Sequence, residues 1–223
     1  MIMKNNLTTI YIVRHGESEY NALPVEDHFV PGQWGEGGAP LTETGKKQAK
    51  ERADHLKDIH FDAIFSSDVA RAIQTAEILK LKRQIAIQTT RAIYERLSYM
   101  IPGKTFKETY KEIRKALKKL DKKAQLAYKP PHQVAMRNES VNETASRLLT
   151  FLREIAVAYQ DKTVLVVNHA NNMRALLQHL GYATIEELFP KGAIENTAYI
   201  VLESDGVDFF VKETFGIYKN QDE

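Results

Sequence analysis

Four short apolar runs, rich in β-branched and aromatic residues, alternate along the chain with longer segments of helical periodicity. The runs are Ile10–Val13, Phe61–Ser66, Ile85–Gln88 and Thr163–Val167. Runs of this length predict buried strands, and apolar residues spaced by three and four predict the helices between them. Strands joined by crossover helices run parallel. The alternation therefore predicts an α/β fold, a three-layer α/β/α sandwich whose mostly parallel central sheet is flanked by helices.

Further patterns locate individual elements of this fold. The run Thr163–Val167 is the most apolar of the four, which favours a place near the centre of the sheet. Near the end of the chain, the turn Ser204-Asp205-Gly206 separates two strand-like runs, Ala198–Glu203 and Val207–Thr214, and predicts a hairpin.

Capping residues mark where three helices are expected to begin. Thr42 or Thr44 precedes a helix that runs to about Asp58, and Asp68 precedes the helix after the second strand. The third start is a capping box, Ser-Val-Asn-Glu at 140–143.

Residues 104–129 form a strongly basic segment with ten lysines and arginines and three acidic residues, a net charge of about +7. A capping box at 105–108 and apolar residues from Phe106 to Ala124, spaced by four and three, predict one amphipathic helix. We expect a helical insertion at about 104–130. It is either a packed helix with a solvated basic face or a lid whose positive field attracts anionic substrates.

Composition limits the class of protein. A net charge of +2 gives no reason to expect a nucleic-acid partner, and the absence of cysteine excludes disulfides and thiolate sites. No apolar run reaches the ~20 residues of a membrane span, and residues 1–6 do not resemble a signal peptide. We therefore expect a cytoplasmic protein without a membrane partner. The 223 residues contain no repeat or linker, so we expect one domain over 1–223.

Charged and imidazole side chains follow the strands at the points where they end. Arg14-His15-Gly16 follows the first strand, Arg71 the second, Glu95 the third and His169 the fourth. The carboxyl ends of parallel strands meet at one edge of a sheet, so these groups should converge there. Burying two imidazoles and two arginines together is costly unless an anion lies among them, and an arginine can grip two phosphate oxygens at once. The sequence thus predicts a phosphate site, with the Gly- and Pro-rich loop at 22–40 as a wall.

Two other chemistries fit the sequence less well. No two histidines have a chelating spacing such as i,i+4, and arginines would repel a metal cation. Ser18 lacks a nucleophile-elbow motif, and the pair Ser66-Ser67 has no catalytic motif around it. We therefore expect neither a metal nor a serine nucleophile.

Four longer blocks stand in order along the chain: Arg-His-Gly-Glu-Ser-Glu-Tyr-Asn at 14–21, Pro-Leu-Thr-Glu-Thr-Gly-Lys-Lys-Gln-Ala at 40–49, Ser-Ser-Asp-Val-Ala-Arg-Ala-Ile-Gln-Thr-Ala at 66–76, and Glu-Ser-Val-Asn-Glu at 139–143. In sequence and order they resemble the motifs of the histidine phosphatase superfamily, also called phosphoglycerate-mutase-like. The resemblance extends from residue 9 to about residue 203. By these motifs the chain is identified as a member of that superfamily, with its fold.

The resemblance implies a role for each candidate site residue. His15 would attack phosphorus and become a phosphohistidine, and Glu95 would protonate the departing alkoxide and later help activate water. His15 must then be neutral, and Glu95 must keep its proton near neutral pH, which burial favours by raising its pKa. No metal or organic cofactor is implied. The phosphoryl group would be held by Arg14, Ser18, Asn21, Arg71, His169 and Ala170.

Three departures from the family pattern bear on the branch and the substrate. Ala170-Asn171 replaces the Gly-Gly that usually follows the second histidine, and residues 96–100 replace a Phe-Gly-x-Trp-Glu-Gly stretch. Residues 96–100 also differ from the mutase patterns, except at Arg96 and Tyr99. The basic segment, the third departure, prevents transfer of a substrate from a relative. We therefore favour the phosphatase branch.

Two alternatives stay open from the sequence. One is a cofactor-dependent phosphoglycerate-type mutase, and the other is a phosphoryl-binding protein with little turnover. The expected partner is a small phosphorylated substrate or a phosphoprotein. Nothing in the sequence indicates the oligomeric state.

Overall fold

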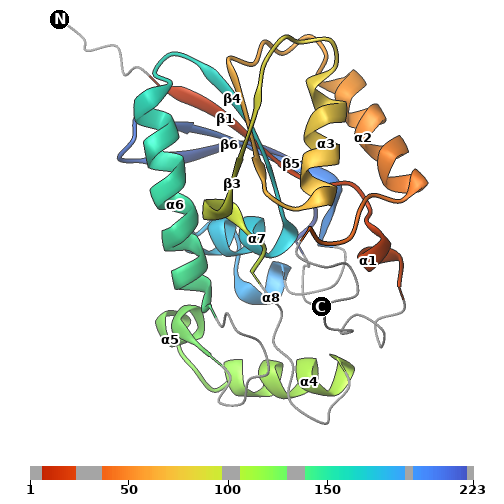
Figure 1. The fold of residues 1–223 in the computed structure, drawn as a ribbon. Helices are drawn as coiled ribbons and strands as arrows, with labels where there is room; N and C mark the ends of the chain where they lie inside the picture. Colours follow the sequence, from red (N-terminus) through yellow and green to blue (C-terminus); the bar gives the residue numbers. More distant parts are fainter. Residues whose placement is uncertain (1–6, 24–36, 97–105, 130–138, 189–192, 220–223) are drawn as a thin grey trace, which may run out of the picture.

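A six-stranded sheet with the order β3-β2-β4-β1-β5-β6 forms the centre of the computed structural model (Figure 1). The structure describes residues 7–23, 37–96, 106–129, 139–188 and 193–219. The strands are β1 (Thr8–Arg14), β2 (Ala63–Ser67), β3 (Ile87–Thr90), β4 (Thr163–Asn168), β5 (Ile194–Ser204) and β6 (Phe209–Ile217). The helices are α1 (Glu19–Ala22), α2 (Glu43–His55), α3 (Ala70–Lys80), α4 (Phe106–Leu117), α5 (Lys122–Ala127), α6 (Val141–Ala158), α7 (Ala170–His179) and α8 (Ile185–Leu188).

Strands β3, β2, β4 and β1 pair in parallel, as the alternation of strands and helices predicts. The apolar strand β4 lies between β2 and β1, which confirms its predicted central place. Strand β3 begins at Ile87, two residues later than expected, because its pairing with β2 starts where Ile87 lies opposite Ile64. The predicted hairpin is also present, since β5 pairs antiparallel with β1 and β6 pairs antiparallel with β5.

Successive sheet residues point to opposite faces, and each face is covered by helices. Ile12 and Val166 belong to a buried cluster that α6 and α7 complete, whereas Val13 and Val167 belong to a cluster completed by α2 and α3. Figure 1 shows α6 on one side of the sheet and α2 with α3 on the other. This arrangement confirms the three-layer prediction. It also directs the ends of the four parallel strands to one edge.

Of the three capping predictions for the starts of α2, α3 and α6, two are confirmed. Thr42 caps α2, where its hydroxyl accepts from the N–H of Gly45 at 3.0 Å, and the Ser140–Glu143 capping box at the start of α6 has both of its hydrogen bonds. The expected Asp68 cap is wrong. Helix α3 follows Val69 and has no side-chain cap, because the Asp68 carboxylate instead accepts from Arg91 Nε at 2.9 Å.

The basic segment forms two helices, so the prediction of one continuous helix is wrong. Helix α4 ends at Leu117, and Asp121 caps α5 by accepting from the N–H of Ala124 at 2.9 Å. The Gln125 side chain donates to the carbonyls of Leu117 and Leu120, which satisfies the end of α4. Thr105, the expected first cap, lies outside the described residues.

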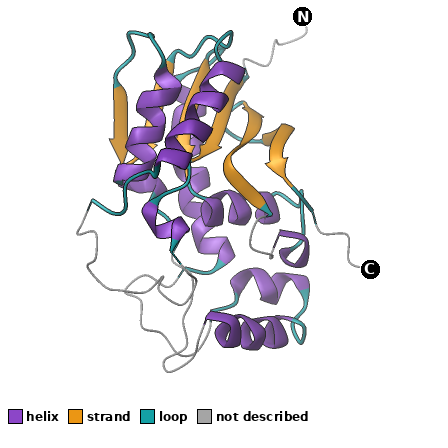
Figure 2. Cartoon of the chain, turned by 90° about the vertical axis from the view of Figure 1, so that its right-hand side faces the viewer, coloured by secondary structure: helices purple, strands orange, loops and turns teal. Residues whose placement is uncertain are grey.

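Helices α4 and α5 lie together at one end of the molecule in both views (Figure 1, Figure 2). Their apolar side is anchored, because Ile113 and Leu117 share a buried cluster with Val141 of α6, Ala175 of α7 and Ile185 of α8. In the described part of the chain, no helix has the length and apolar character that crossing a membrane requires.

Removing the capping box of α6 should destabilise the fold. We expect Ser140→Ala to lower the free energy of unfolding by about 1 kcal/mol, because the N–H of Glu143 loses its acceptor at the helix start. Urea denaturation measures this change. Ser146→Ala, at an exposed position within the same helix, is the control and should leave stability unchanged or slightly higher. Equal effects of the two substitutions would contradict the prediction.

Candidate active site

His15 follows the end of β1 and is fixed by its backbone. Its N–H donates to the carbonyl of Asn168 at the end of β4, and its own carbonyl accepts from Asn196 Nδ2 at 3.3 Å. The neighbouring Gly16 is needed for close packing, since an added Cβ would lie 2.5 Å from the carbonyl oxygen of Gly45. The close approach that Gly16 permits is therefore to the start of α2. His15 itself is 2% exposed.

The hydrogen bonds of the His15 ring identify its unprotonated nitrogen. Nδ1 lies 2.7 Å from the carbonyl oxygen of Gly16, which can only accept, so Nδ1 carries the proton. Nε2 then accepts from Arg71 Nε at 3.1 Å. Burial, reinforced by the charges of Arg71 and Arg14, lowers the pKa of His15 well below its ordinary value. The ring is therefore neutral at neutral pH, with Nε2 unprotonated and its lone pair accepting from Arg71.

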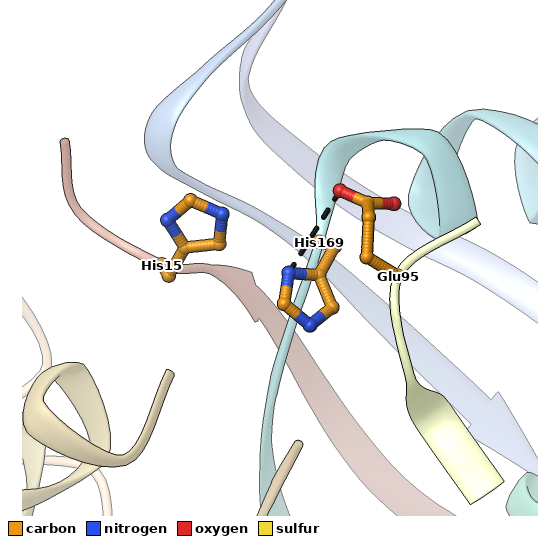
Figure 3. Close-up of side chains that lie close together, drawn as sticks. All are labelled: His15, Glu95 and His169. Carbon is orange, nitrogen blue, oxygen red and sulfur yellow. Dashed lines mark ion pairs between the residues drawn. The ribbon is translucent and has the colours of Figure 1, made fainter. Parts of the chain in front are cut away.

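His169 and Glu95 complete a compact group with His15 (Figure 3). The two imidazole rings are 5.2 Å apart between centroids, and His169 Nδ1 lies 3.8 Å from Glu95 Oε2. Arg71 Nη2 lies 3.4 Å from the same Nδ1, so one guanidinium contacts both imidazoles. The other ring nitrogen of His169 is 2.8 Å from Ser67 Oγ. The predicted convergence of His15, Arg71, Glu95 and His169 is confirmed.

Glu95 has a strongly shifted acidity. Burial raises its pKa to about 7, although the charges of Arg71 and Arg14 act in the opposite direction. Its Oε1 atom is buried and has no hydrogen-bond partner in the described part of the chain, while the side chain as a whole is 21% exposed. A carboxyl group with this pKa can give and take a proton near neutral pH.

Arg14 is partly buried at the end of β1. Its Nη1 donates to the carbonyl of Ile194 at 2.6 Å, while Nε has no hydrogen-bond partner among the described residues. Burial lowers the pKa of Arg14 to about 10 and also lowers the pKa of Arg71, but both remain charged at neutral pH. Two partly buried guanidinium groups at one strand edge favour an anion between them.

Ser18 and Asn21 are held by the start of α1. The Ser18 hydroxyl accepts from the N–H of Asn21, and Asn21 Oδ1 accepts from the N–H of Ser18. This capping box uses Asn21 Oδ1 as an acceptor and leaves the Nδ2 group of the side chain to donate to a phosphate. Asn21 and Arg14 both line a cleft of about 700 Å³. Phosphate binding by Ser18 and Asn21 stays a prediction.

Ala170 begins α7, and His169 is the residue that precedes the helix. The first turn of an α-helix has N–H groups without intrahelical partners and a partial positive charge, so Ala170 brings such a donor to the site edge. The Asn171 side chain instead donates to the carbonyl of Arg96 at 3.0 Å. Asn171 therefore contacts the segment that carries Glu95.

Several residues that contact the site residues are not predicted from the sequence to do so. Ser67 contacts His169, and Thr75 Oγ1 both accepts from the N–H of Gly16 and donates to the carbonyl of Arg71. Both lie inside the block at 66–76, which could have drawn attention to them. Asn196 lies beside Thr197, which has a φ of +58°, and the sequence shows no signal of this turn. Much of the predicted loop wall, at 24–36, and residues 97–100 lie outside the described residues.

The imidazole and carboxylate groups also have the spacing of metal ligands. One ligand atom each from His15, Glu95 and His169 lies within 4.8 Å of the others. Arg71 contacts both imidazoles, however, and its positive charge opposes a cation at this point. The donors and charges around the group suit a phosphoryl dianion better than a metal ion.

Comparisons with known proteins agree with this chemistry. The sequence profile of the histidine phosphatase superfamily (branch 1) matches residues 10–215. Phosphoserine phosphatase 1 of Hydrogenobacter thermophilus is 29% identical over 204 residues, which cover 89% of this chain and 88% of that protein. A 2,3-bisphosphoglycerate-dependent phosphoglycerate mutase of Cytophaga hutchinsonii is 29% identical over 184 residues, 80% of each chain. The relatives thus include both phosphatases and mutases.

Solved structures also resemble the fold of this chain. A solved phosphoglycerate mutase structure from Bacillus anthracis matches with a TM-score of 0.70 at 21% identity, covering 95% of this chain and 94% of that one. This match confirms the expected phosphoglycerate-mutase-like fold. It carries no argument about the reaction, because identity at this level shows the fold alone.

The raised pKa of Glu95 predicts a pH-dependent stability. The folded state keeps the proton up to about pH 7, whereas an unfolded glutamate loses it near pH 4.5. The raised pKa therefore adds its full contribution to the free energy of unfolding below about pH 4.5, and this contribution is lost as the pH rises through 7. We expect Glu95→Gln to be near neutral at pH 4.5 and to raise the free energy of unfolding by roughly 2 kcal/mol at pH 8.

Denaturant unfolding of the native and Glu95→Gln proteins at pH 4.5 and pH 8 measures the difference in the free energy of unfolding. Glu154→Gln, at an exposed position of α6, is the control and should show no such pH dependence. If the Glu95→Gln protein is no more stable than the native protein at pH 8, ionisation of Glu95 does not lower the free energy of unfolding, and the prediction is wrong.

Proposed function

The chain belongs to the histidine phosphatase superfamily, and we propose that it is a phosphatase that hydrolyses phosphomonoesters through a phosphohistidine on His15. The observation that carries this proposal is the pairing of a neutral His15, whose unprotonated Nε2 lies beside Arg71, with the protonatable Glu95. A nucleophile and a proton donor thus belong to one group of side chains, with nitrogen and oxygen atoms within 4.8 Å of each other.

In the first step, His15 Nε2 forms a bond to phosphorus while the bond from phosphorus to the ester oxygen breaks. The Glu95 proton moves to that oxygen, so an alcohol leaves and Glu95 becomes a carboxylate. Charge on the phosphoryl oxygens is balanced by Arg14, Arg71, His169 and the first turn of α7. Donors held in place before the reaction contribute most of the rate in phosphoryl transfer.

In the second step, a water molecule attacks the phosphohistidine. The Glu95 carboxylate takes a proton from the water as its oxygen bonds to phosphorus, and the bond from phosphorus to His15 Nε2 breaks. Inorganic phosphate leaves, and both residues return to their starting protonation states. The cycle uses only groups of this chain, so we propose that it needs no metal or organic cofactor.

The runner-up function is a phosphoglycerate-type mutase, which the similarity to the Cytophaga hutchinsonii enzyme favours. A mutase would return the phosphoryl group from His15 to substrate rather than to water. Interconversion of phosphoglycerate isomers faster than release of phosphate would support the mutase and overturn the phosphatase.

Substitution of the nucleophile tests the proposed reaction directly. We expect His15→Ala to lower kcat/KM for p-nitrophenyl phosphate by at least about 10³-fold and to abolish the acid-labile phosphoprotein seen in the native enzyme after rapid quenching. Excess chelator should leave native activity unchanged. Phosphate binding without turnover in the native protein would instead indicate a phosphoryl-binding protein.

The basic segment yields a second prediction. Seven of its cations, between Lys111 and Lys123, are exposed, and none makes an ion pair among the described residues. We propose that their field draws anionic substrates to the site. Replacing Lys111, Lys115, Lys118 and Lys122 with glutamine should then raise KM severalfold at low salt and have little effect at 0.5 M salt.

Four exposed lysines on and beyond α2, Lys47, Lys50, Lys57 and Lys82, provide a control of equal charge. Their replacement by glutamine should change KM less than the change on α4 and α5. If the two sets behave alike at every salt concentration, the basic segment is a solvated surface without a role in substrate capture.

A further inference from the structure

The segment that carries Glu95 needs support from side chains. It follows a short 3-10 turn, Arg91–Ile93, and is neither helix nor strand. Its backbone groups therefore have no regular partners, and buried backbone groups must find others. The partners come from the two helices behind it, α6 and α7.

Asn172 of α7 supplies most of these partners. It is fully buried, and its Nδ2 donates to the carbonyls of Ile93 at 3.1 Å and Tyr94 at 2.8 Å. Its Oδ1 accepts from the N–H of Arg96 at 3.1 Å. One amide side chain thus holds the backbone on both sides of Glu95.

The same amide is joined to the second histidine. Asn172 Nδ2 also lies 2.8 Å from Asn168 Oδ1, and this oxygen accepts from the N–H of His169 at 2.8 Å. Asn168 and Asn172 are both fully buried. They form the shortest connection between His169 and the segment of Glu95, whose side chains are 3.8 Å apart.

Arg147 of α6 supports the start of the segment from the other side. Its Nη1 donates to the carbonyl of Ala92 at 2.7 Å, and its guanidinium lies 3.7 Å from the centre of the Tyr94 ring. Glu139 pairs with Arg147 through both carboxylate oxygens and accepts from the Tyr94 hydroxyl at 2.6 Å. Arg147 and Glu139 thus contact the side chains of Tyr94 and Arg96, the two neighbours of Glu95, whereas Asn172 binds the backbone of this segment.

We propose that Asn172 is a positioning residue that fixes the carboxyl of Glu95 against the leaving-group side of the phosphoryl site. The inference rests on the proposed function of Glu95 as the proton donor. Without the two Nδ2 bonds, the backbone of Ile93 and Tyr94 loses its nearest support, and the carboxyl moves relative to His169. Proton transfer is sensitive to such displacement, whereas attack by His15 is not.

Leaving groups of different basicity separate these two effects. An alkoxide such as that of ethyl phosphate needs a proton to depart, while p-nitrophenolate departs readily without one. We expect Asn172→Ser to lower kcat/KM for ethyl phosphate by about 10²-fold and that for p-nitrophenyl phosphate by less than about 3-fold. The ratio kcat/KM reports the steps up to phosphohistidine formation, so the later attack of water does not enter.

Two further variants complete the test. Glu95→Gln should show the same dependence on leaving group and defines its full size. Gln178→Leu is the control, because Gln178 is a buried amide on the same helix whose Nε2 has no hydrogen-bond partner in the described part of the chain. It should leave both substrates unaffected. Binding of vanadate should be retained in every variant.

Equal losses for the two substrates in a folded Asn172→Ser protein would overturn the proposal, and so would no loss with either. If Asn172→Ser does not fold, Asn171→Gly removes the bond to the Arg96 carbonyl, together with the bond that Asn171 Oδ1 accepts from Arg174, and should show a smaller selective loss for ethyl phosphate. Failure of the proposed function looks different. In that case Glu95→Gln itself shows no dependence on the leaving group, and the role of Asn172 falls with it.

Discussion

The contact of one guanidinium with two imidazoles determines what this site can do. Arg71 donates from Nε to His15 and lies close to His169 through Nη2. Its place in the first turn of α3 brings it to the edge where β1 and β4 also end. With Arg14 beside it, the edge contains buried positive charge, which is costly until an anion arrives. This cost explains why the group of His15, Glu95 and His169 suits a phosphoryl dianion although its spacing would also suit a metal ion.

Burial shifts the pKa values of His15 and Glu95 in opposite directions, whereas the nearby positive charges lower both. For His15 both lower the pKa, so the ring stays neutral and nucleophilic. For Glu95 burial raises the pKa while the arginines lower it, and burial is the larger effect. One environment therefore yields a base without a proton and an acid with one at the same pH. This environment also lowers the stability of the fold at high pH, because Glu95 ionises above pH 7 in a site that disfavours its charged form.

The sequence predicts the framework and the reacting groups for a common physical reason. Strand periodicity, helix caps and the order of elements depend on neighbouring residues, so they locate β1, β4 and α6 and thereby the convergence of His15 and His169. Features that depend on tertiary contacts cannot be predicted from these local sequence patterns. Asp68 does not cap α3 because Arg91, distant in sequence, binds its carboxylate. Asn172 looks like any polar residue of a helix, and its bonds to Ile93 and Tyr94 appear only in the folded chain.

The choice between hydrolysis and phosphoryl return depends on how water reaches the phosphohistidine. A mutase must hold the intermediate away from water, whereas a phosphatase must bring water to a base beside it. Glu95 has its Oε2 atom beside His169, and its side chain is 21% exposed, so it can exchange protons with solvent and still act on the site. Its backbone is held by Asn172 and bounded by Arg147, which limits its movement between the two steps. In the reaction that we propose, water that reaches this carboxylate after the alcohol has left completes hydrolysis.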